Sequence, residues 1–272
     1  MKSDERASPH HQQFREHPHR LARDYARIAP FYDCTVGITF FLRVRDAFEK
    51  LVRRYGITFC SVADIGCGTG LFACYLNKCW GVPVYGVDRS LEMLRQARRN
   101  CPGVRVCFLQ QDIRCLALPS PVDLITANFD TLNHLNAPQD LRRAFERVAA
   151  NLRRGGHFYF DILTPCQPLN GYRVYVGDRC RVGNWLQQRV RWDPRRRLLR
   201  MRAVQRRVGS CRPVVERITE RAYSAAELGK WLAKAGFTIR GVHDEATLRS
   251  AVDCPPRIVV VAQKAPGGWK SN

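Results

Sequence analysis

The feature that most constrains the fold is a regular alternation of β-type and helical runs between residues 60 and 163. Short apolar runs of strand length are followed by longer runs whose apolar residues recur at helical spacing. The β-type runs are residues 60–65, 82–87, 104–109, 122–128 and 157–163, and the helical runs are residues 71–80, 91–99 and 139–152. This order predicts an α/β fold with a doubly wound parallel sheet, which binds ligands at the carboxyl ends of its strands.

A glycine-rich segment, Asp64-Ile65-Gly66-Cys67-Gly68-Thr69-Gly70, stands where the first β-type run passes into a helix. Glycines let the backbone approach a ligand closely, and the helix N-terminus behind them offers free N–H groups. The segment lacks the GxGxxG pattern of dinucleotide-binding proteins, because Leu71 stands where the third glycine would be. A carboxylate before the glycines would repel a pyrophosphate and suits a ligand with an ammonium group. A tight turn without a ligand is the alternative.

Carboxylates also follow the next two β-type runs. Asp88 ends the second run, where it can accept hydrogen bonds from both hydroxyl groups of a ribose. A helix-capping role is the alternative for this residue. Asp112 follows the third run and can accept a hydrogen bond from an adenine amino group, while Ile113 packs on the ring. Together these positions predict a ligand that contains a nucleoside.

The flanking segments predict additions to the sheet. Helical spacing over residues 21–55, interrupted at Pro30 and Gly37, predicts two helices before the first strand. Residues 172–223 have β-like runs without a helical period, which predicts an antiparallel insert. A helix capped by Ser224 and two closing strands, 237–242 and 257–262, are expected after it. The expected organisation is a disordered tail at 1–19, one domain at 20–265 with the insert at about 172–223, and a tail at 266–272.

In these motifs, and in the run from Leu152 to Asp161, the sequence resembles the class I S-adenosylmethionine-dependent methyltransferases over roughly residues 21–264. The resemblance implies a Rossmann-like sheet of seven strands with the last one antiparallel, and S-adenosyl-L-methionine as cofactor. It places Asp64 and the glycines at the methionine end of the cofactor, Asp88 at the ribose, and Asp112 with Ile113 at the adenine. The cofactor-binding residues that it implies are Tyr32, Asp64, Gly66, Cys67, Gly68, Gly70, Asp88, Arg89, Asp112, Ile113, Asn128 and Phe129.

Further segments are similar to the small-molecule methyltransferases whose N-terminal helices and β-insert cover the substrate. That group includes glycine and amino-sugar N-methyltransferases. The segments are Tyr25–Asp33, Asn128–His134, and the insert together with Glu216–Gly236. This resemblance implies methyl transfer to nitrogen or oxygen of a small-molecule metabolite by in-line displacement, without a metal. Tyr25 and Tyr32 are expected to close over the cofactor, with a place in the core as the alternative.

The methyl acceptor is expected at the carboxyl end of the strand that ends at Asn128. His134 and Asp130 follow it and are the candidate catalytic residues, because each has or can acquire a pKa suited to taking a proton. An ordinary loop histidine is the alternative for His134. Orientation and exclusion of water can carry much of such a reaction, so the use of a general base stays open.

The chain is strongly basic, with 45 Lys and Arg against 24 Asp and Glu and a formal net charge of +21. Nine arginines crowd between Arg189 and Arg207. A solvated face of a half-exposed sheet is one interpretation, and docking of an anionic substrate or of RNA is the other. The alternative functions are therefore an RNA methyltransferase and a non-catalytic cofactor-binding module. The oligomeric state is left open, with a homodimer as one option.

The 12 cysteines are spread through the chain without a CxxC pair or other short zinc-ligand spacing. The first 20 residues lack the apolar core of a signal peptide, and no apolar run approaches the length of a membrane span. We therefore expect a soluble, cytoplasmic protein whose cysteines are reduced and act as small buried apolar residues.

Overall fold

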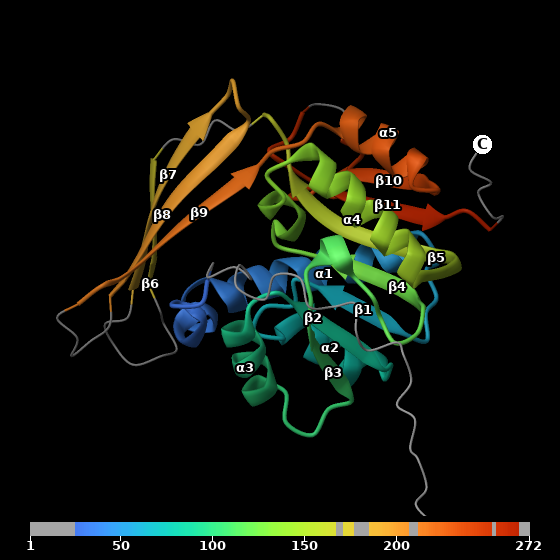
Figure 1. The fold of residues 1–272 in the computed structure, drawn as a ribbon, viewed down its shortest axis with the longest axis horizontal. Coiled ribbons are helices and arrows are strands. Elements are labelled where there is room, and N and C mark those ends of the chain that lie inside the picture. The colour runs from blue at the N-terminus through green and yellow to red at the C-terminus, as the bar shows by residue number, and fades with distance from the viewer. Residues whose placement is uncertain (1–24, 167–170, 177–184, 207–211, 252–253, 267–272) are drawn as a thin grey trace, which may run out of the picture.

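A computed structural model describes residues 25–166, 171–176, 185–206, 212–251 and 254–266, and the larger of its sheets has seven strands (Figure 1). The strand order is β10-β11-β5-β4-β1-β2-β3. The strands are β1 (Val62–Ile65), β2 (Val84–Asp88), β3 (Val106–Gln110), β4 (Val122–Ala127), β5 (Leu152–Leu163), β10 (Phe237–Asp244) and β11 (Arg257–Lys264). Strands β1 to β5 are parallel, and β11 is antiparallel to both of its neighbours. The predicted doubly wound sheet with an antiparallel last strand is confirmed.

Helices cover both faces of this sheet (Figure 1). One face carries α1 (Ile38–Arg54), α2 (Leu71–Trp80) and α3 (Leu91–Asn100), and the other carries α4 (Pro138–Asn151) and α5 (Ala225–Lys234). Residues at helical spacing, such as Val44, Phe48 and Leu51 of α1, are buried against the strands. Burial of these apolar stripes on both sides of the sheet gives a three-layer domain. Among the described residues, no helix combines the length and the apolar character that crossing a membrane requires.

The ends of the helices follow local sequence signals. Ser224 caps α5 in a capping box with Glu227, and the helix ends before Gly236, as predicted. Helix α2 lies between Gly70 and Gly81, whose φ angles of 81° and 70° are in the left-handed region that favours glycine. These residues determine where the chain leaves β1 and where it turns back into the sheet.

The segment before α1 differs from the prediction of two helices. Its described part has a turn, a 3-10 turn at Ala29–Phe31 and a π-helical turn at Asp33–Gly37 that continues directly into α1. The expected break at Gly37 is wrong. A Cβ at this position would lie 2.7 Å from Asp33 Oδ1 and 2.9 Å from the Tyr32 ring, so the glycine permits close packing within the turn. The start of the expected first helix and the tail at 1–19 lie outside the described residues, as does 267–272 of the C-terminal tail.

The insert forms a second, antiparallel sheet, in agreement with the prediction. Its order is β6-β7-β8-β9, with β6 (Gly171–Val176), β7 (Trp185–Asp193), β8 (Leu198–Arg206) and β9 (Val214–Arg221). On its inner face Leu186 and Ala203 pack with Val36, Tyr32 and Phe40 of the segment around the π-helical turn and the start of α1. The second sheet therefore covers the N-terminal segment from outside the main domain.

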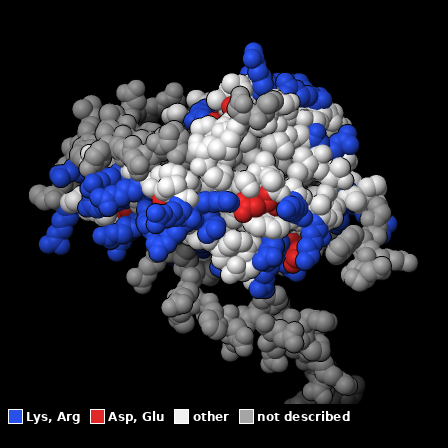
Figure 2. Space-filling model, turned by 90° about the horizontal axis from the view of Figure 1, so that it is seen from above, with Lys and Arg blue, Asp and Glu red and all other residues white. Residues whose placement is uncertain are grey.

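Most of the clustered arginines lie on the opposite, exposed face of the second sheet, and Arg195, Arg196 and Arg197 lie in the turn between β7 and β8. Arg189, Arg202 and Arg217 occupy directly paired positions on three neighbouring strands, and all three are exposed. Figure 2 shows basic side chains gathered at the end of the molecule that this sheet forms. Strand alternation turns these arginines away from the face that packs on the domain. Arg207, the last of the nine, lies outside the described residues.

The expectation for the cysteines is wrong in two respects. Disulfides join Cys74 to Cys101 and Cys166 to Cys254, with Cα atoms 5.8 Å apart in each pair. Of the free cysteines that the structure describes, Cys67 is buried, and four are exposed: Cys60, Cys79, Cys107 and Cys115. The paired cysteines are separated by 27 and 88 residues in the chain. A search for short spacings between cysteines could therefore not detect that they lie close together.

Candidate functional site

A cavity lies at the carboxyl ends of β1, β2 and β4, where a doubly wound sheet binds its ligands. It brings together most of the site residues that the sequence predicts. Those in its wall are Tyr32, Asp64, Gly66, Cys67, Gly68, Asp88, Arg89, Asp112, Ile113, Asn128, Phe129 and His134. Their roles in binding or catalysis remain predictions, whereas their convergence on one cavity is a property of the structure.

The glycine-rich turn is held against the end of β2. The N–H groups of Gly66 and Cys67 donate to the carbonyl of Val87 at 2.7 and 3.0 Å. The Gly68 N–H donates to Asp88 Oδ2 at 2.9 Å. A Cβ on Gly66 would overlap the side chain of Thr131, whereas one on Gly68 would meet nothing closer than the Gly66 carbonyl at 4.0 Å. Gly68 therefore leaves an open backbone surface toward the cavity.

Asp88 is a partly buried carboxylate that orders the loops around it. Its Oδ1 accepts the N–H of Ser90 at 2.8 Å, while its Oδ2 holds the Gly68 N–H. Burial raises the pKa of Asp88 above its usual value, and these backbone hydrogen bonds oppose the shift. Each oxygen retains further acceptor capacity for ligand hydroxyl groups.

A second buried polar group lies between β1 and β4. Asp64 is 3% exposed, and its Oδ1 accepts the Thr126 hydroxyl at 2.8 Å. Burial raises the pKa of Asp64 to about 7. Asn128 borders the same cavity and is 3% exposed, yet within the described ranges neither atom of its carboxamide has a hydrogen-bond partner. A buried amide without partners is costly, so a ligand in the cavity would satisfy it.

Asp112 reaches the cavity with its carboxylate already occupied. Arg114 donates to it through Nη2 at 2.7 Å and through Nε and the backbone N–H at 2.9 Å. Burial raises the pKa of Asp112, but the hydrogen bonds from Arg114 outweigh it and the net pKa is lowered. Ile113 follows in the cavity wall as a buried apolar side chain. Ile113 thus offers the apolar surface that the predicted adenine site needs.

Two predicted site residues are not in the cavity wall. Gly70 packs against α3 instead, where a Cβ would lie 2.9 Å from that of Ala97. Asp130 points to β11, where its Oδ2 pairs with Arg257 Nη2 at 2.7 Å. Arg257 also pairs with Asp161, so Asp130 belongs to an ion-pair cluster that is largely withdrawn from solvent. Strand β11 is distant in sequence, and no local signal indicated this partner.

His134 ends the short helical turn Thr131–His134 after β4, and its ring borders the cavity. The Tyr25 ring packs edge-on against the His134 ring, with centroids 5.5 Å apart, and against Tyr32 at 5.9 Å. Burial, with a smaller contribution from Arg89, lowers the pKa of His134 to about 3. The imidazole is therefore neutral over the physiological pH range.

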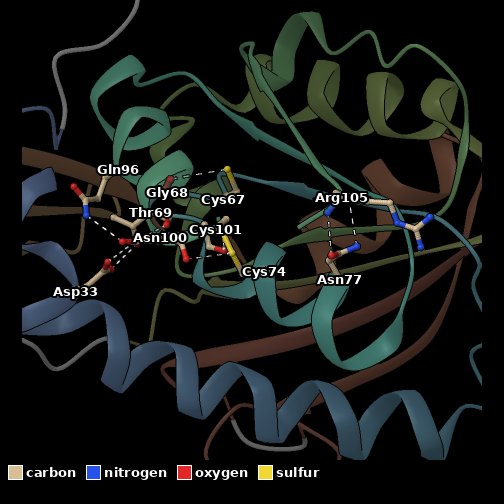
Figure 3. The surroundings of a disulfide bond; sticks show 11 residues. Asp33, Cys67, Gly68, Thr69, Cys74, Asn77, Gln96, Asn100, Cys101 and Arg105 are labelled. Atoms are coloured by element: carbon tan, nitrogen blue, oxygen red, sulfur yellow. Dashed lines mark hydrogen bonds between the residues drawn. A yellow bond between two sulfur atoms is a disulfide. The ribbon is translucent and has the colours of Figure 1, made fainter. Parts of the chain in front are cut away.

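A polar network ties the N-terminal segment to the glycine-rich turn. Asp33 Oδ1 accepts the Thr69 hydroxyl at 2.5 Å, and Asp33 Oδ2 accepts the Asn100 amide at 2.7 Å. Asn100 also donates to the Thr69 carbonyl at 2.9 Å (Figure 3). The disulfide between Cys74 and Cys101 lies beside this network. The contacts fix the N-terminal segment beside the turn.

The sequence analysis did not identify the apolar residues that complete the cavity. They come from the N-terminal segment, from the first turns of helices, and from the turn before His134: Gly37, Phe41, Leu71, Phe72, Met93, Thr131 and Leu135. Helical periodicity marks several of these residues as apolar, but it does not distinguish a residue in the core from one in a cavity wall. Within the described ranges, no cluster of three or more His, Cys, Asp or Glu side chains is arranged to hold a metal ion.

These residues fit a ligand that combines a nucleoside with a charged amino-acid-like end. Asp88 can receive ribose hydroxyl groups, and Ile113 provides apolar contact for a base. Asp64 and the unpaired amide of Asn128 can receive an ammonium group and a carboxylate, next to the open backbone at Gly68. The fold is that of a doubly wound α/β protein, and the cavity has the groups that a nucleoside ligand needs.

Comparisons with known proteins identify the class. A family model described as a methyltransferase domain matches residues 62–156, from β1 to the start of β5. A trans-aconitate 2-methyltransferase of Azoarcus sp. (strain BH72) is 42% identical over 87 residues, covering 32% of this chain and 34% of that protein. A dTDP-3-amino-3,6-dideoxy-alpha-D-glucopyranose N,N-dimethyltransferase of Streptomyces fradiae is 33% identical over 106 residues, covering 39% and 40%. The chain spans between 34% and 57% of the length of the curated relatives it matches.

Solved structures agree on the fold over most of the chain. An S-adenosylmethionine-dependent methyltransferase from Clostridium acetobutylicum has a TM-score of 0.74 at 24% identity, covering 89% of this chain and 99% of that one. DesVI of Streptomyces venezuelae has a TM-score of 0.70 at 20% identity, covering 90% and 100%. Residues 62–156 thus match a methyltransferase domain, and the described chain has the fold of the class I S-adenosylmethionine-dependent methyltransferases.

Proposed function

We propose that the protein transfers a methyl group from S-adenosyl-L-methionine to nitrogen or oxygen of a small-molecule metabolite. The observation that carries this proposal is the convergence of Asp64, Asp88 and the glycine-rich turn on one cavity. The wall of the same cavity also includes Asn128 and His134. The names of the two curated relatives support it, since both describe methyl transfer to small molecules. When bound, the cofactor supplies an electrophilic methyl carbon on a positively charged sulfur.

The proposed roles follow from the geometry. Asp88 would receive the ribose hydroxyl groups and Ile113 would pack on the adenine, while Asp64 and Asn128 would hold the methionine end. Tyr32, Arg89 and Phe129 line the same cavity and complete the proposed contacts. The chain thereby orients the reacting groups and excludes water, which favours an in-line displacement.

The alternatives from the sequence are less well supported. An RNA methyltransferase would dock through the arginine-rich hairpin, but Arg189, Arg202 and Arg217 face away from the main domain and do not line the cavity. Among the described residues, no arginine of the hairpin lines the cavity, whereas the buried carboxylate of Glu220 lies 3.8 Å from His134 in the cavity wall. That arrangement also argues against an anionic acceptor. A cytoplasmic location remains part of the proposal, and the two disulfides count against it, because thiols in the cytosol are usually kept reduced.

The proposal is tested by calorimetry with S-adenosylmethionine and its demethylated product, followed by a labelled-methyl screen over fractionated cell extract. Binding of both compounds and transfer of label to a low-molecular-mass fraction are expected. Transfer of label only to RNA or to protein would contradict the small-molecule acceptor. Absence of binding of either compound would contradict the whole proposal.

Replacing Asp88 with asparagine is expected to weaken cofactor binding about tenfold to a hundredfold, because hydrogen bonds to a charged group contribute about 1.5–3 kcal/mol. The amide also presents a donor to the N–H groups of Gly68 or Ser90, which loosens the turn. Calorimetric titration measures the loss. Asp193→Asn, at the end of β7 outside the cavity wall, is the matched control and is expected to bind with unchanged affinity.

The pH dependence of cofactor binding is expected to report on Asp64. Its pKa of about 7 leaves the free carboxyl largely neutral at pH 6, whereas an ammonium group on the ligand favours the ionised form. Binding at pH 6 should therefore release a proton, and affinity should rise as the pH increases through about 7. Calorimetry in buffers of different ionisation enthalpy measures the released proton. Asp64→Asn should abolish this component, and an unchanged proton release in that variant would assign it to another group.

A further inference from the structure

His134 faces a buried carboxylate of the second sheet. Its Nε2 lies 3.8 Å from Glu220 Oε1 on β9. Both side chains are largely withdrawn from solvent, with 15% of His134 and 4% of Glu220 exposed. Such a distance lies in the ion-pair range, and catalytic hydrogen bonds are often longer in ligand-free structures than in the reactive complex.

Backbone contacts on both sides hold Glu220 next to His134. The Asn133 side chain donates to the carbonyl of Arg221 at 2.7 Å, and the Asn136 side chain donates to the carbonyl of Thr219 at 3.2 Å. The two acceptors directly precede and follow Glu220 on β9. The turn that carries His134 is therefore joined to β9 around the two facing side chains.

The same face of β9 also positions the aromatic neighbour of His134. The carboxylate of Glu216 accepts the N–H groups of Tyr25 and Arg27 at 2.5 and 2.6 Å, which places the Tyr25 ring against the imidazole. Strand alternation puts Glu216 and Glu220 on one face, and both are buried. The second sheet thus organises the part of the cavity that surrounds His134.

Neither candidate base of the sequence analysis is suited to act alone. With Glu220 at 3.8 Å, the pKa of His134 is about 3, because burial and, to a smaller extent, Arg89 disfavour the imidazolium, so the imidazole is a weak base unless the contact with Glu220 tightens. Asp130 is paired with Arg257 and is not in the cavity wall. The groups that face the imidazole are Glu220 from β9, Arg89 after β2, and the ring of Tyr25, which in turn contacts the ring of Tyr32. Among these, Glu220 is the anion that can stabilise a protonated imidazole.

We propose that Glu220 is a positioning residue for His134: it holds the imidazole with its Nε2–H toward the carboxylate and leaves Nδ1 free to take the proton of the methyl acceptor. This inference rests on the proposed function. For each methyl group that the acceptor gains from the sulfonium, its nitrogen or oxygen loses one proton. That proton passes to Nδ1 of His134, and the Glu220 carboxylate stabilises the imidazolium until the proton is released to water. The proton acceptor is thereby assembled from the main domain and the β-insert together.

The first test is the tautomer of His134, measured by long-range ¹H–¹⁵N correlation and assigned by comparison with His134→Gln. In the wild-type protein at neutral pH, the ring is expected to carry its proton on Nε2. In Glu220→Gln, which keeps the size of the side chain, the two tautomers are expected to mix. This readout needs no methyl acceptor. Identical tautomer signals in both proteins would overturn the proposal.

The second test is the pH profile of methyl transfer with an acceptor found in the screen. Loss of the carboxylate lowers the pKa of the imidazole, so the acidic limb of kcat should move to lower pH in Glu220→Gln. At the same time kcat is expected to fall about tenfold to a hundredfold, with KM for the cofactor unchanged. Glu220→Asp should keep part of kcat. A fall in kcat without a shift of the acidic limb would indicate a merely structural role and would overturn the proposal.

Arg217→Gln is the matched control, because Arg217 lies on the exposed face of the same strand. It is expected to keep the wild-type tautomer, kcat and pH profile, and a shift of the acidic limb in this variant would contradict a specific role for Glu220. Calorimetry with the cofactor separates the two levels of the proposal. A protein that binds no cofactor contradicts the proposed function and this inference with it. If the protein binds the cofactor normally, but Glu220→Gln has the wild-type tautomer of His134 and the wild-type acidic limb, only this inference is contradicted.

Discussion

Gly66→Ala is expected to lower the free energy of unfolding by about 2–5 kcal/mol and to abolish measurable cofactor binding. Alanine in the left-handed region costs about 1–2 kcal/mol, and overpacking adds about 1–3 kcal/mol. At Gly66 both costs apply, because φ is 69° and the new Cβ would overlap Thr131, with Cγ2 at 2.6 Å. Thr131 cannot simply rotate away without loss, since its hydroxyl donates to the Asn128 carbonyl at 2.6 Å.

Gly81→Ala is the matched control for this prediction. Its φ of 70° imposes the same backbone strain, but an added Cβ there would meet nothing within 4 Å. The control should therefore lose only about 1–2 kcal/mol and keep cofactor affinity. Urea unfolding followed by tryptophan fluorescence gives both stabilities, and calorimetry gives binding. Equal losses of stability in the two variants would mean that the contact with Thr131 is not a constraint on the turn.

Arg257→Ala is expected to lower the free energy of unfolding by about 1.5–3 kcal/mol, because the change removes hydrogen bonds to two charged carboxylates that are largely withdrawn from solvent. Arg257 Nη2 lies 2.7 Å from Asp130 and Nη1 lies 3.3 Å from Asp161. Asp161 in turn accepts the N–H groups of Phe129 and Asp130 at 2.8 and 2.9 Å. The ion-pair cluster therefore holds the turn between Asn128 and His134 in place through the backbone of Phe129 and Asp130. Loss of the cluster should also reduce cofactor affinity.

The destabilisation in Arg257→Ala should increase with pH. Burial raises the pKa of Asp130 to about 6, while Arg257 opposes the shift and Asp161 adds to it. A carboxyl group whose pKa is raised on folding stabilises the native state most at low pH, and this contribution is lost as pH rises through the folded pKa. Without Arg257 the pKa of Asp130 rises further, so this carboxyl group stays protonated to higher pH. At a pH above that pKa, ionisation of Asp130 lowers the free energy of unfolding more in Arg257→Ala than in the wild-type protein. Unfolding at pH 5 and pH 8 measures the difference.

Arg202→Ala is the control for the arginine cluster. This side chain is exposed on the outer face of the second sheet, where a substitution is expected to change stability by no more than about 0.5 kcal/mol. A large loss in Arg202→Ala, or a loss in Arg257→Ala that does not depend on pH, would contradict this account of the ion-pair cluster.

The sequence was a good guide wherever local signals and sheet topology act together. The alternation of strands and helices predicted the sheet, and Ser224 marked the start of α5. Asp64, Asp88 and Asn128 were placed together because the carboxyl ends of neighbouring parallel strands share one edge. Those inferences need only a repeating period and a rule of topology, both of which are present in a single sequence.

Local sequence signals could not predict contacts between residues that are distant in the chain. The position of Asp130 after β4 suggested that it takes a proton from the methyl acceptor, yet its carboxylate forms an ion pair with Arg257 of β11. Cys166 and Cys254 are 88 residues apart and still form a disulfide. The face on which the arginines of the insert lie was likewise set by the register of β7 to β9, which places Arg189, Arg202 and Arg217 on the outside. In each case the deciding neighbour comes from a strand or loop that is remote in the chain.

The sequence by itself determined the sheet, the glycine-rich turn and the cavity at its edge, because glycine content, strand-end carboxylates and hydrophobic period act locally. Only the tertiary structure decided which side chains surround the proposed methyl acceptor. Packing of β9 against the turn after β4 brings Glu220 to His134, and packing of β11 removes Asp130 from the cavity wall. Both decisions depend on contacts between elements that are 80 or more residues apart, as the hydrogen bond from Asn136 to Thr219 across 83 residues illustrates.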